Sequence, residues 1–452
     1  MPGVTHEDLP LELWLEIFRL ATYTSCTVRR PDPFIPEVAI TDIMGYNTPF
    51  SSMRTKCSLV LVCRSWRQVA TEILYEHIAI RSPRRAKLIL ATLQGSPPAK
   101  AGEDPANDVS NRNHDVYPNY GQWTRSIEVH THARGGKSVR YLETVFRIMQ
   151  HCPKVRMFKA FWNWVAPAAF LQAFSRLYSQ SLQGLLWNEN DVTFGLTCAT
   201  PGFLSSFQSL RILDIRHISG CDLSSPSPTS PKPLLPYVTE LVLSDTMPGF
   251  NIASALDLPA LHRLSIESIR MHPNQFGRNP DLLPIARRFL NIHGPKITRL
   301  EIASFACIDA RMFLLPGVCP YLQDLVIHET HPLLHQMSEP HPFLRRIGLR
   351  GVATDKLYPD KTSTVTKHLR SFMTDIFPSL EVVRTISYLV DSAVDSLARD
   401  IFIWWAERFE RYGIDFQDGE GVLWMYTDAA PSGVKDGDNS LCTSTSMKVT
   451  SF

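Results

Sequence analysis

One short apolar motif recurs along the chain between residues 122 and 390. Each copy has an apolar residue, two variable residues, a second apolar residue, one variable residue and a third apolar residue. The clear copies begin at Leu210, Val238, Leu261, Ile297, Leu322 and Leu344, and weaker ones lie around Ile127, Val155, Leu182 and Leu380. Because the last two apolar residues are two positions apart, they lie on one face of a short strand. A single strand cannot bury that face, whereas a stack of such strands builds a continuous core.

The spacing of the motif favours a solenoid of strand-plus-helix units. From Leu210 onward the copies begin 28, 23, 36, 25 and 22 residues apart. A proline stands before most of the predicted strands, where its missing N–H costs no ladder hydrogen bond. Segments between the strands, such as residues 282–293 and 367–377, have helical periodicity. The alternative interpretation is an ordinary α/β domain whose strands happen to be alike.

The array resembles a degenerate leucine-rich repeat, whose period is roughly 20–29 residues. We therefore expect an α/β protein in which a small all-α module is followed by a solenoid over residues 122–390. The leucine-rich family usually has Asn or Cys three residues after the last motif leucine. Here those positions are Ile218, Thr246, Ile269, Phe305, Thr330 and Val352. The absence of this polar ladder leaves the curvature of the array open.

Clusters of proline, glycine and serine divide the rest of the chain. The segments that we predict are a helical module over residues 1–80 with an insertion at 25–50, a helix and flexible linker over 81–121, a disordered loop at 219–236 within the array, a C-terminal cap over 391–428 and a disordered tail over 429–452. A cap is expected because the last repeat of a solenoid otherwise exposes its core.

An amphipathic helix over residues 394–412 is the predicted cap. Its apolar stripe consists of Leu397, Ile401, Trp404 or Trp405, and Phe409. A partner-binding groove is the alternative function for this stripe. Residues 421–426, GVLWMY, are predicted to add an edge strand.

The N-terminal module contains two helical patterns on either side of the insertion. Residues 8–24 and 56–78 both repeat apolar side chains at helical spacing. The first pattern contains LPLELWLEIF and the second LVLVCRSWRQVATEILYEHI, and together they resemble the F-box family. The matching residues are Leu9, Pro10, Glu12, Ile17, Phe18, Leu61, Val62, Cys63, Arg64, Trp66, Arg67 and Tyr75. A helical bundle of no special purpose is the alternative.

The resemblance implies that the module docks onto the Skp-type adaptor of an SCF ubiquitin ligase, which links it to cullin and RING subunits. The residues that the resemblance assigns to this docking face are Leu9, Pro10, Leu13, Ile17, Val62, Cys63 and Trp66. Trp66 fits a docking role and a core role equally well. The insertion at 25–50 departs from the family, which joins its first two helices by a handful of residues. A long loop costs little free energy, but it is able to cover or extend the adaptor surface.

Side chains that alternate with the buried apolar ones are candidates for contact with an unknown protein substrate. The candidates are Arg216, Arg263, Glu267, Arg299, Glu301, Asp324, His328, Arg346 and Arg350. Their mixed charge suits a protein surface better than a polyanion. The alternative for each of them is a solvated side chain that contacts no partner.

Charge and cysteine usage exclude several classes of function. The 46 basic and 44 acidic residues give a net charge of +2, so there is no general attraction to nucleic acid or to an anionic membrane. No apolar run is long enough to cross a bilayer. The nine cysteines are scattered and form no CxxC pair, which favours a reduced, intracellular protein of the cytoplasm or nucleus.

Sequence motifs of common enzymes are missing from the chain, and we expect a non-enzyme with no cofactor and no metal. The nearest exception is a histidine-rich segment with His328, His331, His335 and His341, for which surface histidines and a metal-dependent hydrolase are the two alternatives. The sequence therefore predicts a substrate-recognition subunit of an SCF-type E3 ubiquitin ligase. The alternative is a leucine-rich-repeat interaction scaffold with an F-box-like fold and no ligase role.

Overall fold

The computed structural model forms two compact units. Unit 1 comprises residues 1–31 and 44–323, and unit 2 comprises residues 32–43 and 324–452. The residues that the structure describes are 9–22, 32–34, 49–95, 119–130, 137–162, 166–189, 200–218, 232–268, 282–303, 308–334, 337, 339–359, 362–386, 388–390 and 396–425. The predicted tail at 429–452 lies outside them, as do most of the predicted linker and most of the predicted loop at 219–236.

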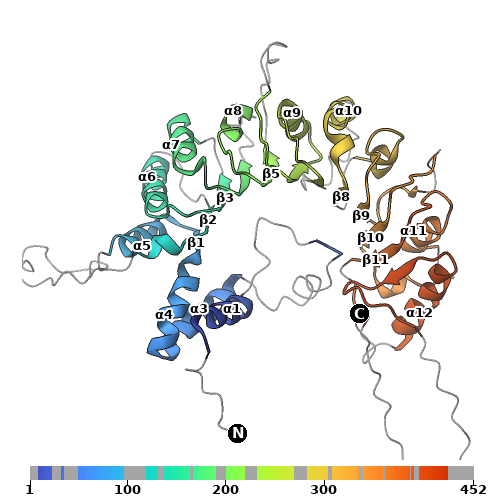
Figure 1. The fold of residues 1–452 in the computed structure, drawn as a ribbon, viewed down its shortest axis with the longest axis horizontal. Helices are drawn as coiled ribbons and strands as arrows, with labels where there is room; N and C mark the ends of the chain where they lie inside the picture. The colour runs from blue at the N-terminus through green and yellow to red at the C-terminus, as the bar shows by residue number, and fades with distance from the viewer. Residues whose placement is uncertain are drawn as a thin grey trace, which may run out of the picture. The chain divides into compact units, whose positions relative to one another are not determined.

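Unit 1 begins with three helices (Figure 1), which are α1 (Leu11–Ala21), α3 (Pro49–Val62) and α4 (Arg64–Glu76). Cys63 is in extended conformation and separates α3 from α4. Its Sγ accepts a hydrogen bond from the backbone N–H of Trp66 at 3.4 Å, which caps the start of α4. The core of this helical module consists of Phe18, Val69, Ala70 and Ile73.

Parallel strands follow the helical module and pair in chain order within unit 1. They are β1 (His77–Ile80), β2 (Ser126–His130), β3 (Met157–Trp162), β4 (Gly184–Glu189), β5 (Ile212–Ile218), β6 (Glu240–Ser244), β7 (Arg263–Glu267) and β8 (Arg299–Ile302). The motif leucines Leu213, Leu241, Leu264 and Leu300 stand opposite one another from β5 to β8. All four are buried, so the period-two spacing builds one continuous apolar row.

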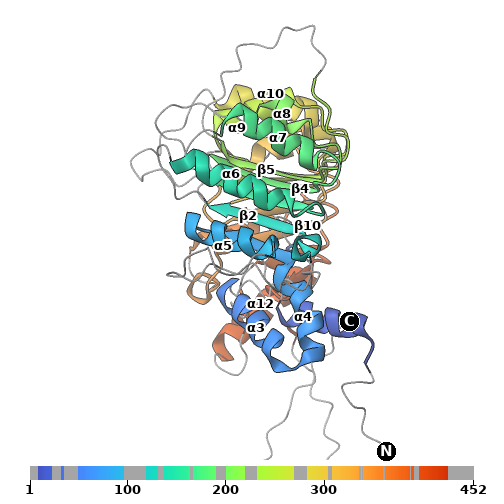
Figure 2. The same cartoon turned by 90° about the vertical axis from the view of Figure 1, so that its left-hand side faces the viewer.

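Helices connect these strands and lie along one side of them, as Figures 1 and 2 show. They are α5 (Pro83–Leu93), α6 (Lys137–Gln150), α7 (Ala168–Tyr178), α8 (Pro201–Leu204), α9 (Met247–Ala255) and α10 (Leu282–His293). Short 3₁₀ turns are η2 (Tyr120–Trp123), η4 (Gly294–Lys296) and η5 (Ala310–Leu314). This alternation of parallel strands and helices confirms the predicted α/β class and is consistent with a solenoid-like arrangement.

Unit 2 continues the same pattern with four parallel strands in chain order. They are β9 (Asp324–His328), β10 (Arg346–Arg350), β11 (Val382–Thr385) and β12 (Asp415–Gln417). Its helices are α11 (Thr364–Phe372), α12 (Ser396–Glu410) and the 3₁₀ turn η7 (Thr354–Lys356). Residues 32–34 of the N-terminal insertion also belong to this unit.

The C-terminal helix α12 buries most of the predicted apolar stripe. Trp405 is fully buried, and its indole N–H donates to the backbone oxygen of Leu357 at 2.7 Å. Leu397 is 52% exposed, so its assignment to the stripe was wrong. Phe402 lies inside instead, and its ring stacks on that of Phe416 in β12 at 4.4 Å. The helix therefore packs mainly through its centre rather than its first turn.

Several boundaries differ from those expected. The strands begin at β1, before residue 122, and continue to β12, after residue 390. The last strand is residues 415–417 instead of 421–426, where Leu423 makes only an isolated bridge to Gln417. β1 begins inside the segment 56–78 that was expected to be helical, and its Ile78 and Ile80 alternate on one buried face like the motif residues of the other strands. β12 has three residues and pairs with β11. The predicted loop at 219–236 also ends early, since Leu234 forms a bridge with Asp257.

Candidate partner-binding surfaces

Apolar side chains are exposed along one face of α1. Leu13, Ile17 and Leu20 are 49%, 43% and 67% exposed, and their spacing places them on one face of the helix. Leu61 and Val62, at the end of α3, are 83% and 59% exposed. Single exposed leucines are common on proteins, but several on one small module make this face a candidate partner-binding surface.

The other side of α1 packs into an aromatic cluster of Trp14, Phe18 and Trp66. The ring of Trp66 lies 4.8 Å from that of Phe18, edge to face, and 5.1 Å from that of Trp14. Phe18 is 2% exposed and Trp66 is partly buried against the same core. Trp66 therefore packs against the core of the module, and part of its side chain stays exposed.

The remaining predicted docking residues lie at the ends of these helices. Pro10 is exposed directly before α1, and Leu9 before it is half-buried. Cys63 is exposed between α3 and α4, where the hydrogen bond between its thiol and the Ser65 hydroxyl lowers the pKa of the thiol. Leu20 was not among the predicted docking residues, although it continues the same helical spacing as Leu13.

Charged side chains of unit 1 that were expected to contact a substrate bind one another across the strands. Arg263 in β7 is 7% exposed and lies between two carboxylates, 3.7 Å from Glu240 in β6 and 3.9 Å from Glu301 in β8. The strand register brings these three together because consecutive parallel strands place equivalent positions side by side. Arg299 lies at the start of β8 and is half-buried.

A second ion-pair group surrounds Arg216 in β5. Its guanidinium binds the buried Asp214 carboxylate at 2.6 Å and also pairs with Glu267 of β7. Arg216 and Glu267 were both predicted to face a substrate. In the structure their ion pair links β5 to β7 across β6.

A third charged group lies on β1, β2 and β3, where the sequence analysis assigned no site. The Glu128 carboxylate lies 2.6 Å from Nε2 of His130 and 3.6 Å from Nε2 of His77. Burial acts to raise the pKa of Glu128, but the hydrogen bond from His130 and the charge of Lys159 outweigh it and bring that pKa to about 2. Burial lowers the pKa of His77 to about 4. The carboxylate therefore stays charged and ties three strands together.

Charged residues of unit 2 are also paired. Arg346 in β10 makes a bidentate ion pair with the buried Asp324 of β9, at 2.6 and 2.5 Å. Arg350 and His328 stand opposite each other at the ends of β10 and β9, and both are half-buried. Nδ1 of His328 lies 3.1 Å from the Thr330 hydroxyl, and burial lowers the pKa of this histidine.

The histidine-rich segment has a structural role. His331 and His341 are buried, and His335 lies outside the described residues. Nε2 of His368 in α11 lies 3.1 Å from the backbone oxygens of both Glu329 and His331, which fixes the turn after β9. In the part of the chain that the structure describes, no three potential metal ligands gather in one place.

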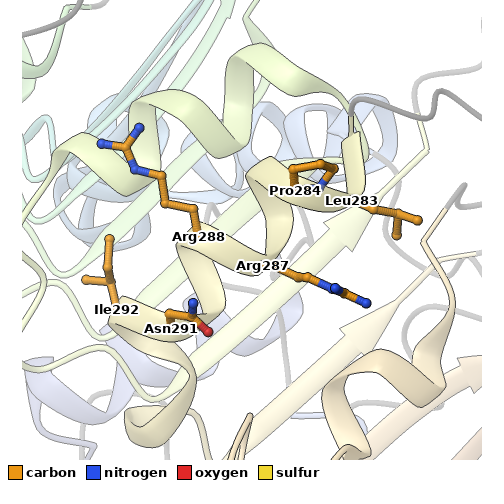
Figure 3. Close-up of a pocket in the computed structure, with 6 residues that line it drawn as sticks. All are labelled: Leu283, Pro284, Arg287, Arg288, Asn291 and Ile292. Atoms are coloured by element: carbon orange, nitrogen blue, oxygen red, sulfur yellow. The ribbon is translucent and has the colours of Figure 1, made fainter.

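The residues that the structure describes line two pockets of unit 1, among others. One is lined by residues of α10, namely Leu283, Pro284, Arg287, Arg288, Asn291 and Ile292 (Figure 3). The other, of about 550 Å³, lies between α3, α4, β1 and α5, with mostly apolar walls and with Arg54, Arg81 and Arg85 among its lining.

Comparison with known proteins adds little to this description. No protein-family model matches the chain, and no curated protein matches it. A solved structure of a Bacteroides fragilis protein is similar over 66% of this chain and 76% of its own, with a TM-score of 0.35 and 12% identity. A similarity this weak supports no conclusion. Within the described residues, no helix combines the length and the apolar character needed to cross a membrane.

Proposed function

We propose that the chain is the substrate-recognition subunit of an SCF-type E3 ubiquitin ligase. Its helical module is an F-box that docks a Skp-type adaptor, and through that adaptor the chain joins cullin and RING subunits. The observation that carries the proposal is the exposed face of Leu13, Ile17 and Leu20 on α1, above the Trp14–Phe18–Trp66 cluster. A module this small gains stability by burying such a face against a partner.

The parallel strands and their helices are the part that selects a protein substrate in this proposal. The chain itself then performs no chemistry. It raises the effective concentration of the substrate at the ligase, as a linked binding site does. It works inside the cell, in the cytoplasm, the nucleus or both.

The test is capture of a purified Skp-type adaptor by the full chain. The double variant Leu13→Asp, Ile17→Asp puts two charges on the proposed docking face, and we expect adaptor affinity at least about tenfold weaker, roughly 1.4 kcal/mol. Val139→Asp is the matched control, because Val139 on α6 is 65% exposed but lies away from the helical module.

Melting temperatures of all three proteins show whether the substitutions leave the fold intact. Adaptor binding that is equal in the wild type and in the double variant contradicts the proposed docking face. A wild-type chain that binds no Skp-type adaptor contradicts the ligase role and favours an interaction scaffold without one.

A further inference from the structure

Residues 32–34 of the insertion lie on the strands of unit 2, on a surface that we call the Phe34 site. The ring of Phe34 packs on Val326 of β9 and on Ile386, which directly follows β11, and the side chain is 7% exposed. Gly348 of β10 stands between these two elements. A side chain there would meet Ile386 at 2.9 Å and Val326 at 3.0 Å. The apolar floor of the site therefore depends on a residue without a side chain.

Two guanidiniums lie against the ring of Phe34. Arg346 is 4.7 Å and Arg384 is 5.6 Å from the ring centre, within the range of cation–π attraction. Nη1 of Arg384 also donates to the backbone oxygen of Pro33 at 3.3 Å. The Asp32 carboxylate is close enough to act on the charge of both arginines.

The arginines of the Phe34 site are fixed by partners of their own. Arg346 is held by Asp324 in a bidentate pair, and Arg384 donates to Oε1 of Gln417 in β12 at 3.1 and 2.5 Å. The site is therefore preorganised, and a ligand does not bear the cost of ordering these long side chains. Its features select an aromatic ring, a carboxylate and one backbone carbonyl.

The three occupying residues present these groups in a compact form. Oδ1 of Asp32 accepts the backbone N–H of Phe34 at 3.0 Å, so the carboxylate and the ring are held in one turn. The contact is small, with one anchoring ring and one backbone hydrogen bond. Such a small contact is weak by itself, but residues 32–34 are tethered to the site by the chain, which gives them a high effective concentration there.

We propose that the Phe34 site binds a short turn of a partner protein with an acidic residue two positions before a phenylalanine, and that residues 32–34 compete for it from within the chain. This inference deepens the proposed function, on which it rests for the role of the partner, namely the protein that the ligase selects. The insertion then acts as an internal ligand of the substrate-binding part.

The test uses the full chain and a fluorescent peptide with the sequence of residues 28–38, VRRPDPFIPEV. Anisotropy measures peptide binding to the wild type and to Phe34→Ala, in which the internal ligand lacks its ring. We expect the peptide to bind Phe34→Ala at least about tenfold more tightly than the wild type. A peptide with alanine in place of its phenylalanine should bind neither protein.

Asp32→Lys provides a second variant, because it reverses the charge beside two arginines without removing a buried ring. It should also increase affinity for the peptide, and a melting curve checks that each variant is folded. Peptide affinity that is the same in all three proteins, or that survives alanine in the peptide, overturns the proposal. Adaptor capture by the same proteins is measured separately, so failure of the Phe34 site and failure of the ligase role give different results.

Discussion

The indole of Trp66 lies edge-on against the ring of Phe18 at 4.8 Å, and this contact joins α4 to α1. Apolar residues of the helical module fall into two groups, those that pack together and those that are exposed. Phe18 and Trp66 belong to the inside, whereas Leu13 and Leu20 on the same helix as Phe18 are about half exposed or more. The two groups should respond differently to truncation.

Phe18→Ala is expected to lower the free energy of unfolding of the helical module by about 3 kcal/mol or more, because it empties a buried aromatic position. Leu20→Ala is the matched control and should change the free energy by less than about 0.5 kcal/mol. Urea unfolding followed by tryptophan fluorescence checks both. Equal effects of the two changes would mean that the inner and outer sides of α1 are wrongly assigned.

Arg263→Met is expected to lower the free energy of unfolding by about 3 kcal/mol, since it removes a buried cation from between Glu240 and Glu301. Arg263→Lys keeps the positive charge and should lower the free energy of unfolding by less. Thermal unfolding of the two variants measures the difference. If methionine is tolerated as well as lysine, the carboxylates do not depend on this ion pair.

Gly294→Ala should destabilise unit 1, because a side chain at this position would lie 2.2 Å from the backbone oxygen of Val318. Overpacking of this kind lowers the free energy of unfolding by about 1–3 kcal/mol. Gly202→Ala is the control, since a side chain there has nothing within 4 Å. Denaturant midpoints should fall for the first variant and stay nearly constant for the second. A constant midpoint for both would contradict this close approach.

Lowering the pH should reduce the folding stability of unit 1 through His293, which is fully buried in α10. Burial lowers its pKa to about 4, below the value of about 6.5 in an unfolded chain. Stability from the neutral ring is therefore complete above pH about 6.5 and is lost as the pH falls towards 4. At pH 5 the loss is about 2 kcal/mol.

His293→Leu is expected to flatten the dependence of melting temperature on pH between about 7 and 5, because leucine does not titrate. The exposed His262 supplies the control variant, His262→Leu, which should keep the slope of the wild type. An unchanged slope in His293→Leu would assign the acid sensitivity to other groups.

Local spacing specified most of the strands, because two apolar residues two positions apart define one face of a strand. The motif copies at Leu210, Val238 and Leu261 each lead into a strand as expected, and the helix expected at residues 282–293 has those bounds. The terminal strands β1 and β12 were not predicted. β1 follows a helical pattern without a proline or glycine to separate them, and β12 has only three residues.

Only the tertiary structure decided which charged and aromatic residues meet. Arg263 has its carboxylate neighbours because of the strand register, and Trp66 lies in the core because α1 packs against α4. Phe34 is more than 300 residues from Arg346 in the sequence, yet its ring lies against that guanidinium. Local periodicity carries no information on such contacts, because their geometry arises only when distant segments have packed together.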